Sequence, residues 1–404
     1  MKLRILRLCI FVAMATAIHA EDFLDSLDET LTFSVLNDRA QVRMSGALDI
    51  EYYYVDEPPF GLVNSTANNL FNPRLSLFLD AQFGPKIYFF AQARVDRGFD
   101  PASDDVRMRL DEYAVRFTPW EDGRLSIQLG KFSPIIGNWM ARHLSWDNPF
   151  ITAPLPYEHI TKISEIEVPT SAAEFTHDFG ADTAYEYNPV IWSADYATGV
   201  SVSGRLGRFE YAAEMKNSAL SARPESWDAT EIGFDHPTFS ARIGWRPTIA
   251  WNLGVSASRG PYMRPEVEPL LPRGRGIGDY MQTVFGQDIS FAKGHFQIWA
   301  ELYEARFEVP NVGNADTLAY YIETKYKFTP EFFAALRWNQ QLFDNVSDGL
   351  GGKTAWGHDL WRADAAIGYR FTPHTQLKLQ YSMESEDGPR GQSHAFGAQF
   401  TVRF

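Results

Sequence analysis

The chain has 404 residues, of which 45% are hydrophobic and 15% aromatic, and its formal net charge is −14. This acidic balance argues against nucleic acid as a partner, because phosphate binding requires a basic surface. The single cysteine, Cys9, lies near the N-terminus, so the rest of the chain cannot use disulfides, thiol catalysis or thiolate metal sites.

Residues 1–20 have the pattern of a secretory signal peptide. Three basic residues precede an apolar run over residues 8–17, which is too short to span a bilayer as a helix. Ala20 is the candidate cleavage point, and an uncleaved N-terminal anchor is the alternative. Removing the segment leaves 34 of the 37 Lys and Arg residues against 51 Asp and Glu residues, a net charge of −17.

Residues 21–39 differ from the rest of the chain and form an N-terminal periplasmic helix or arm in our interpretation. Four apolar residues recur at helical spacing among acidic ones, which predicts a short amphipathic helix. They are Phe23, Leu24, Leu27 and Leu31. Such a helix could plug a pore, contact another subunit or stay a solvated arm, and the sequence leaves these alternatives open.

From residue 40 to residue 404 the chain alternates between apolar and polar residues with a period of two. This alternation predicts β-strands that each have one apolar and one polar face. No apolar stretch after the N-terminal segment is long enough for a transmembrane helix. Sixteen alternating segments occur, near residues 40–53, 74–83, 87–96, 112–117, 125–130, 197–206, 209–217, 237–246, 250–259, 280–291, 294–305, 317–328, 331–343, 360–371, 375–385 and 392–404.

The connections between these segments alternate in length. Short turns, most of them with Gly or Pro, occur at 84–86, 118–123, 207–208, 247–248, 292–294, 329–330 and 372–373. Long polar connections occur at 55–71, 97–107, 218–235, 260–278, 306–316, 344–358 and 386–391. Short turns at one end and long loops at the other are typical of an all-β, transmembrane, antiparallel up-and-down β-barrel. We predict about 16 strands; a faint strand pattern in residues 171–179 would make 18 if it belongs to an extra pair.

The last thirteen residues, Gln392 to Phe404, show the alternation most strictly. Every second residue from Phe404 back to Phe396 is apolar, and the residues between them are mostly polar. This segment resembles the final strand of Gram-negative outer-membrane β-barrels, where the terminal aromatic residue is part of the assembly signal. The resemblance implies this role for Phe404 and implies that the barrel-assembly machinery inserts the chain.

Residues 133–196 interrupt the pattern after the fifth strand. A connection this long is usually functional or disordered. Disorder is unexpected here because the segment is dense in Trp, Phe, Tyr and Ile. An ordered aromatic loop needs a surface to pack on, and the inner wall of a barrel supplies one.

The whole mature chain resembles a trimeric porin of Gram-negative bacteria. The stretch Gly130-Lys131-Phe132-Ser133-Pro134 is similar to the start of the long third loop in the phosphate-selective porins. The resemblance implies that residues 133–196 fold into the lumen and narrow the pore. It also implies a homotrimer in the outer membrane, surrounded by lipid and lipopolysaccharide.

Charged residues on the polar faces are the candidates for lining the pore. By its position in the resemblance, the loop region contributes Lys131, Arg142, His143, Asp147 and Glu158, and the alternation contributes Arg43, Arg74, Arg94, Arg116, Arg337, Arg362 and Arg370. Phosphate-selective porins have a strongly basic lumen, whereas basic residues only slightly exceed acidic ones on these faces. We therefore expect weak or no anion preference; the alternative is that these charges pair with one another and only keep the wall wet.

The sequence predicts a channel for passive diffusion of small hydrophilic solutes and ions, and not an enzyme. The histidines are scattered and have no paired spacing that would bind a metal. The glycines of residues 274–278 lack the preceding strand and following helix of a nucleotide site. We therefore expect no catalytic residue, metal or cofactor. Two alternatives remain open. An outer-membrane barrel hydrolase would need a polar catalytic cluster at its rim, and a secreted soluble β-rich glycan-binding protein would bury the apolar face.

Overall fold

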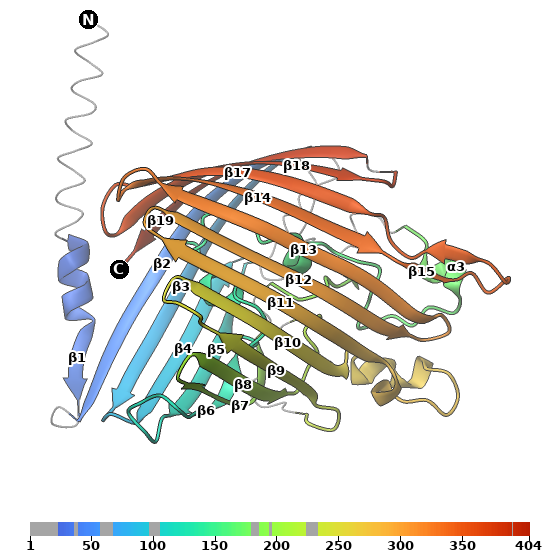
Figure 1. The fold of residues 1–404 in the computed structure, drawn as a ribbon, viewed down its shortest axis with the longest axis horizontal. Coiled ribbons are helices and arrows are strands. Elements are labelled where there is room, and N and C mark those ends of the chain that lie inside the picture. Colours follow the sequence, from blue (N-terminus) through green and yellow to red (C-terminus); the bar gives the residue numbers. More distant parts are fainter. Residues whose placement is uncertain are drawn as a thin grey trace, which may run out of the picture.

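Sixteen antiparallel strands form a closed up-and-down barrel in a computed structural model of the chain (Figure 1). The structure describes residues 23–35, 39–56, 68–96, 106–178, 186–193, 196–223, 233–389 and 391–404. Each barrel strand pairs with the next one along the chain, and the last pairs with the first. The barrel strands are β2 (Ala40–Val55), β3 (Asn69–Phe83), β4 (Ile87–Asp96), β5 (Arg107–Phe117), β6 (Ser126–Phe132), β7 (Ala197–Leu206), β8 (Phe209–Lys216), β9 (Thr238–Trp245), β10 (Trp251–Pro261), β11 (Met281–Lys293), β12 (Phe296–Val309), β13 (Gly313–Lys327), β14 (Phe332–Phe343), β17 (Leu360–Arg370), β18 (Thr375–Glu386) and β19 (Gln392–Arg403).

The predicted barrel of sixteen strands is confirmed, and the segment that could have added an extra pair is not a strand. Residues 172–175 within it form a short helix, α3 (Ala172–Phe175), which Ser171 caps. The prediction of a long connection at 306–316 is wrong. β12 and β13 continue outward to a turn of residues 310–312, and the ion pair between Arg306 and Asp316 (2.7 Å) joins the two extensions.

The predicted signal peptide, residues 1–20, lies outside the described residues and stays a prediction. Parts of the predicted connections 55–71, 97–107 and 218–235 also lie outside them. No helix in the described part of the chain is long and apolar enough to cross a membrane.

The apolar faces of the strands point outward. On β2, for example, Leu48, Ile50 and Tyr52 are exposed, whereas Asp49 and Glu51 between them are buried inside the barrel. A continuous outer band of this kind is stable against lipid and unstable in water. The orientation is opposite to the one that a soluble β-rich protein would need.

An N-terminal helix and a short strand cover the seam of the barrel. β19 pairs only with residues 47–55 of β2, so the first residues of β2 would be left as an open edge. β1 (Thr32–Val35) pairs with residues 40–43 and closes this gap. The helix of residues 23–30 precedes β1 and lies at the short-turn end of the barrel, near the C-terminus (Figure 1). The sequence predicted the helix and missed β1.

The described residues of the inserted loop, 133–178 and 186–193, belong to the green segment in Figure 1, which enters the barrel and reaches the long-loop end, where α3 lies beside β15. Among its described residues, the regular structure is limited to short helical turns, η1 (Met140–Arg142), α2 (Leu155–Glu158) and α3. Its apolar residues, such as Trp139 and Tyr157, form the main hydrophobic cluster together with wall residues such as Tyr303 and Phe307. The core therefore occupies one side of the lumen.

Long-loop segments at the far end of the barrel add to this cluster. Ala219 and Leu220 come from the β8–β9 loop, and Val267 and Ile277 come from η3 (Pro265–Leu270) and η4 (Ile277–Asp279). The hairpin of β15 (Asn345–Ser347) and β16 (Lys353–Ala355) leads into the buried Trp356, whose ring stacks on Phe175 of α3 at 5.8 Å between ring centres. These described loop residues therefore extend the hydrophobic cluster over one side of the barrel.

Candidate pore and its constriction loop

The polar lining of one half of the barrel binds the inserted loop, whose described residues are 133–178 and 186–193. A buried segment with little regular structure must find partners for its backbone N–H and C=O groups. Lumen-facing side chains supply them. The Lys378 ammonium on β18 donates to the carbonyl oxygens of Ser145, Asn148 and Phe150 at 2.7, 3.0 and 3.0 Å. Gln380, two residues along the same face, accepts from the Ile151 N–H at 2.6 Å.

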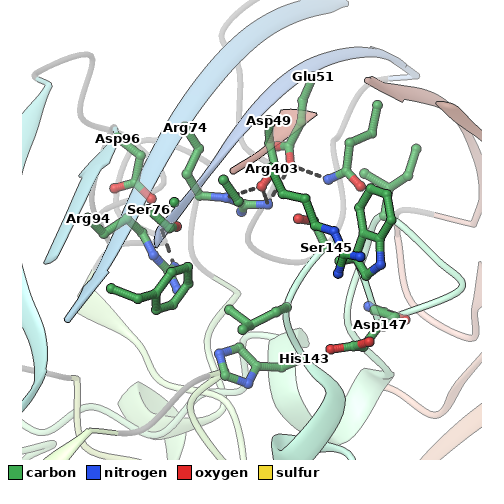
Figure 2. A pocket seen from close by; sticks show the side chains of 18 of the residues that line it. Asp49, Glu51, Arg74, Ser76, Arg94, Asp96, His143, Ser145, Asp147 and Arg403 are labelled. Atoms are coloured by element: carbon green, nitrogen blue, oxygen red, sulfur yellow. Dashed lines mark hydrogen bonds and ion pairs between the residues drawn. The ribbon is translucent and has the colours of Figure 1, made fainter. Parts of the chain in front are cut away.

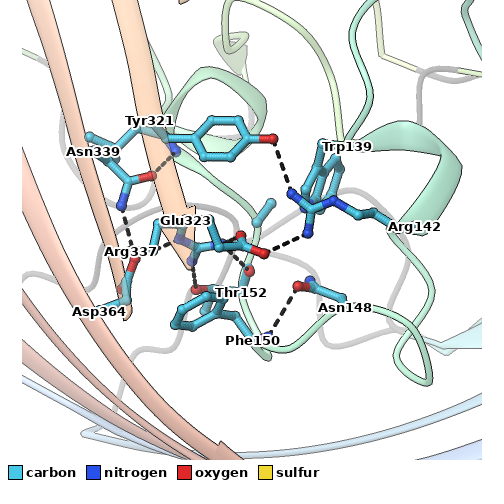
Figure 3. A network of polar contacts seen from close by, with 12 residues as sticks. Trp139, Arg142, Asn148, Phe150, Thr152, Tyr321, Glu323, Arg337, Asn339 and Asp364 are labelled. Atoms are coloured by element: carbon cyan, nitrogen blue, oxygen red, sulfur yellow. Dashed lines mark hydrogen bonds and ion pairs between the residues drawn. The ribbon is translucent and has the colours of Figure 1, made fainter. Parts of the chain in front are cut away.

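Buried arginines strengthen this attachment (Figure 3). Arg337 on β14 donates to the Asp364 carboxylate at 2.8 Å and to the backbone and side-chain oxygens of Thr152 at 3.1 and 3.0 Å. Arg142 points the other way, from the loop to the Glu323 carboxylate of β13 at 2.6 Å. Charge-assisted hydrogen bonds of this kind are about twice as strong as neutral ones, so they hold the loop in one position.

Three of the predicted pore-lining arginines belong to this attachment and not to the open pore. Arg142, Arg337 and Arg362 are at most 9% exposed. None of them is among the described residues that line the cavity, which is presented below. Arg362 donates to the Ala153 carbonyl oxygen and to the Glu158 carboxylate. The reason for the difference is that the loop itself covers the half of the wall on which Arg337 and Arg362 lie.

A cavity of about 770 Å³ remains on the opposite side, between the loop and strands β2 to β5 and β19. The wall contributes Asp49, Glu51, Arg74, Arg94, Asp96, Arg109 and Arg403, and the loop contributes His143, Ser145, Trp146 and Asp147 (Figure 2). Of the residues predicted from the sequence, this cavity brings together Arg43, Arg74, Arg94, His143, Asp147, Glu158 and Phe404. Asp25 and Asp28 of the N-terminal helix also border it.

The charges on this wall form ion pairs. Arg74 binds Asp49 and Glu51 at 3.1 and 2.7 Å, and Arg94 binds Asp111 at 3.1 Å. The wall therefore presents both signs of charge in a paired row, which is the alternative that the sequence left open. A row of both signs keeps the lumen wet and disfavours strong selectivity for ions of one sign.

Sequence reasoning missed Arg109 and Asp111. A β-bulge on β5 places Asp111 and Glu112 together opposite Gln92 of β4. The extra residue reverses the alternation upstream of it, so Arg109 faces the lumen. Its Nε donates to the Asp111 carboxylate at 2.8 Å, and its terminal nitrogens bind Asp96. No period-two pattern could have found this pair.

Three other predicted residues lie off the cavity. Arg116 on β5 donates to Gln128 at 2.8 Å and lies over the ring of Tyr88. Lys131 is in β6, opposite Tyr113 of β5. Arg370 lies against the ring of Trp146, with 4.9 Å between the guanidinium carbon and the ring centre.

His143 is fixed in one protonation state at the edge of the cavity. Its Nδ1 lies 2.6 Å from the Met140 carbonyl oxygen, which can only accept, so Nδ1 carries the proton. Its Nε2 then accepts from the Tyr196 hydroxyl at 2.9 Å. Desolvation, together with the positive charge of Arg94 and Arg74, lowers the pKa of His143 to about 4. The imidazole is therefore neutral at neutral pH.

This low pKa predicts a dependence of stability on pH. The unfolded chain takes up the proton near pH 6.5 and the folded chain only near pH 4. Above pH 6.5 the neutral His143 does not reduce the free energy of unfolding. As the pH drops from 6.5 toward 4, this free energy falls by at most about 1.4 kcal/mol per pH unit, because the unfolded chain binds the proton more readily. Thermal unfolding in detergent between pH 7.5 and 4 should show a steeper loss for the wild type than for His143→Gln. Parallel curves would contradict the assignment.

The sixteen-stranded closed barrel, its apolar outer face and the loop folded into its lumen define the architecture of a porin-type barrel. The chain is similar to solved structures of this class. OmpT of Vibrio cholerae in its trimer form has 11% identity and a TM-score of 0.55, covering 91% of this chain and 100% of that one. The outer membrane channel DcaP of Acinetobacter baumannii has 12% identity and a TM-score of 0.56, covering 92% and 99%. An anion-selective porin from Comamonas acidovorans has 10% identity and a TM-score of 0.54, covering 90% and 100%.

At these identities the similarity establishes the fold alone. The sequence matches no protein-family model and no curated protein. Within the described ranges there is also no group of three or more His, Cys, Asp or Glu side chains that could hold a metal ion.

Proposed function

We propose that the protein is a porin of the Gram-negative outer membrane, through which small hydrophilic solutes and ions diffuse passively. One observation carries this proposal: a charged cavity of about 770 Å³ lies between the lumen wall and a firmly attached loop, inside a barrel whose outer face is apolar. The loop is attached by buried charge-assisted hydrogen bonds, so it narrows the lumen without sealing the side of β2 to β5.

The position of the chain ends supports an orientation in the membrane. The short turns, β1 and the C-terminal end of β19 lie at one end of the barrel, which is the periplasmic end in this proposal. The long loops then face outward, in contact with lipopolysaccharide. Residues 1–20 act as the signal peptide for export, and the barrel-assembly machinery inserts the chain.

The paired charges support mild selectivity at most. Arg74, Arg94 and Arg109 each have a carboxylate partner on the wall, so no ring of one sign surrounds the cavity. One of the similar structures is described as an anion-selective porin and another as a trimer form. We propose a homotrimer with a weak anion preference or none, and no enzymatic activity.

Reconstitution into planar lipid bilayers tests the proposal. We expect stepwise increases in conductance and, under a gradient of KCl, a reversal potential near zero or shifted slightly toward the chloride potential. Absence of channels would overturn the function, and strong cation selectivity would overturn the proposed preference. A second check is migration on a gel, because barrels of this kind resist SDS until they are heated.

A further inference from the structure

One arginine on the cavity differs from the others, because it has no acidic partner among the described residues. Five arginines border the cavity, and the structure pairs four of them with carboxylates: Arg43 with Asp28, Arg74 with Asp49, Arg94 with Asp111 and Arg109 with Asp96. The fifth, Arg403 on β19, forms no ion pair with any residue that the structure describes. Its Nε donates to the Pro373 carbonyl oxygen at 2.8 Å, and its two terminal nitrogens have no hydrogen-bond acceptor among the described residues.

An aromatic ring holds this arginine in place. The Arg403 guanidinium carbon lies 3.9 Å from the ring centre of Trp146, and the guanidinium of Arg370 lies against the same ring at 4.9 Å. Stacking of this kind fixes a guanidinium group without using its N–H donors. The terminal donors of Arg403 therefore remain available on a side chain that borders the cavity near the loop (Figure 2).

The surroundings of this pair of guanidinium groups are positive on balance. Among the described residues, Arg370 donates to two neutral acceptors, the Gln376 side chain at 3.0 Å and the Trp146 carbonyl oxygen at 3.4 Å. The acids that face Arg403 are Asp147, which forms no ion pair among the described residues, and Asp28, which Arg43 already neutralises at 3.0 Å. Asp25 borders the same part of the cavity and is bound by His374 at 2.8 Å. Two guanidinium groups therefore share one ring, and neither of them forms an ion pair with a described residue.

We infer that Arg403, supported by Trp146 and Arg370, is a binding station for small oxyanions, of the carboxylate or phosphate class, on the short-turn side of the loop. The free edge of a guanidinium group presents two parallel N–H donors, which match two oxygens of such an anion. The inference rests on the proposed function, because it requires that solutes reach the cavity. The inference adds one anion-binding site to a cavity in which the other four arginines are paired with carboxylates.

Channel currents test the station. Chloride current through reconstituted channels is measured while potassium phosphate, or potassium acetate in a second arm, is added at constant ionic strength. In the wild type we expect the added anion to reduce the current, and the more effective salt identifies the preferred class. Arg403→Gln should raise the half-inhibitory concentration roughly tenfold or more, because it removes one charge-assisted bidentate contact.

Two further variants make the result specific. Asp147→Asn removes the free carboxylate and should lower the half-inhibitory concentration, a gain that misfolding would not produce. The double variant Asp28→Asn, Arg43→Gln removes a cavity arginine together with its partner and should stay within about twofold of the wild type. Channels that form normally but respond equally in wild type and Arg403→Gln would overturn the station and leave the porin function standing. Absence of channels in the wild type would overturn both.

Discussion

Replacement of Arg337 by methionine should loosen the inserted loop while the barrel itself still forms. Arg337 is 2% exposed and binds Asp364 and Thr152, and its guanidinium carbon lies 4.3 Å from the ring centre of Phe150. Removing one partner of a buried charge pair typically costs about 3–5 kcal/mol, because the other charge stays buried without it. Here Arg362, at 3.3 Å from the Asp364 carboxylate, retains part of the compensation, so we expect the lower end of that range.

The consequence should be visible in the channel. With residues 150–155 released from the wall, single-channel conductance should rise and become noisier, and the loop should become sensitive to protease. The strand ladders do not involve the side chain of Arg337, so resistance to SDS before heating should remain. The matched control is Arg306→Met, whose exposed pair with Asp316 should contribute at most about 1 kcal/mol. Unchanged conductance and protease resistance in Arg337→Met would show that these buried contacts do not hold the loop.

The barrel could be predicted from the sequence because every strand has one apolar and one polar face. The apolar outer face and the polar lumen face repeat the same alternation sixteen times, and this repetition located strands such as β4 and β7 to the residue. The strand prediction failed where a bulge interrupted the alternation and where two strands extend beyond their predicted ends. The bulge at Asp111 reversed the pattern of β5, and the extensions of β12 and β13 around residues 310–312 are polar enough to look like a loop.

The sequence could not predict which charged residues border the cavity and which bind the loop. Arg74 and Arg337 both lie on the polar face of a strand, yet one borders the cavity and the other fixes the loop. The difference depends on which half of the wall the loop covers, and that is decided by contacts such as Lys378 with Ser145, more than 230 residues apart in the chain. A single sequence shows that a strand has a polar face, but it does not show which distant segment of the chain packs on that face.

Deletion of Phe404 should impair formation of the barrel far more than the conductance of the channels that do form. Phe404 closes the seam: its N–H donates to the Gly46 carbonyl oxygen at 3.0 Å, and its carbonyl oxygen accepts from the Gly46 N–H at 3.0 Å. Its ring covers Gly46 so closely that a Cβ there would lie 2.5 Å from the ring. Burial of such a ring contributes about 1.5–3 kcal/mol, and each backbone hydrogen bond contributes about 0.5–1.5 kcal/mol. The fraction of SDS-resistant protein measures the effect.

Two variants separate the possible causes of this defect. Gly46→Leu keeps Phe404 but displaces its ring, so it should reproduce the loss of stability. Phe285→Ala removes a ring from the outward face of β11, away from the seam between β19 and β2, where Phe285 is 58% exposed, and should have a smaller effect. If the deletion slows refolding of purified protein in detergent as well as assembly in cells, the seam contact is the cause. If purified protein refolds normally and only cellular assembly fails, the terminal ring acts as the recognition signal that the final strand resembles. Normal assembly in both settings would contradict both roles.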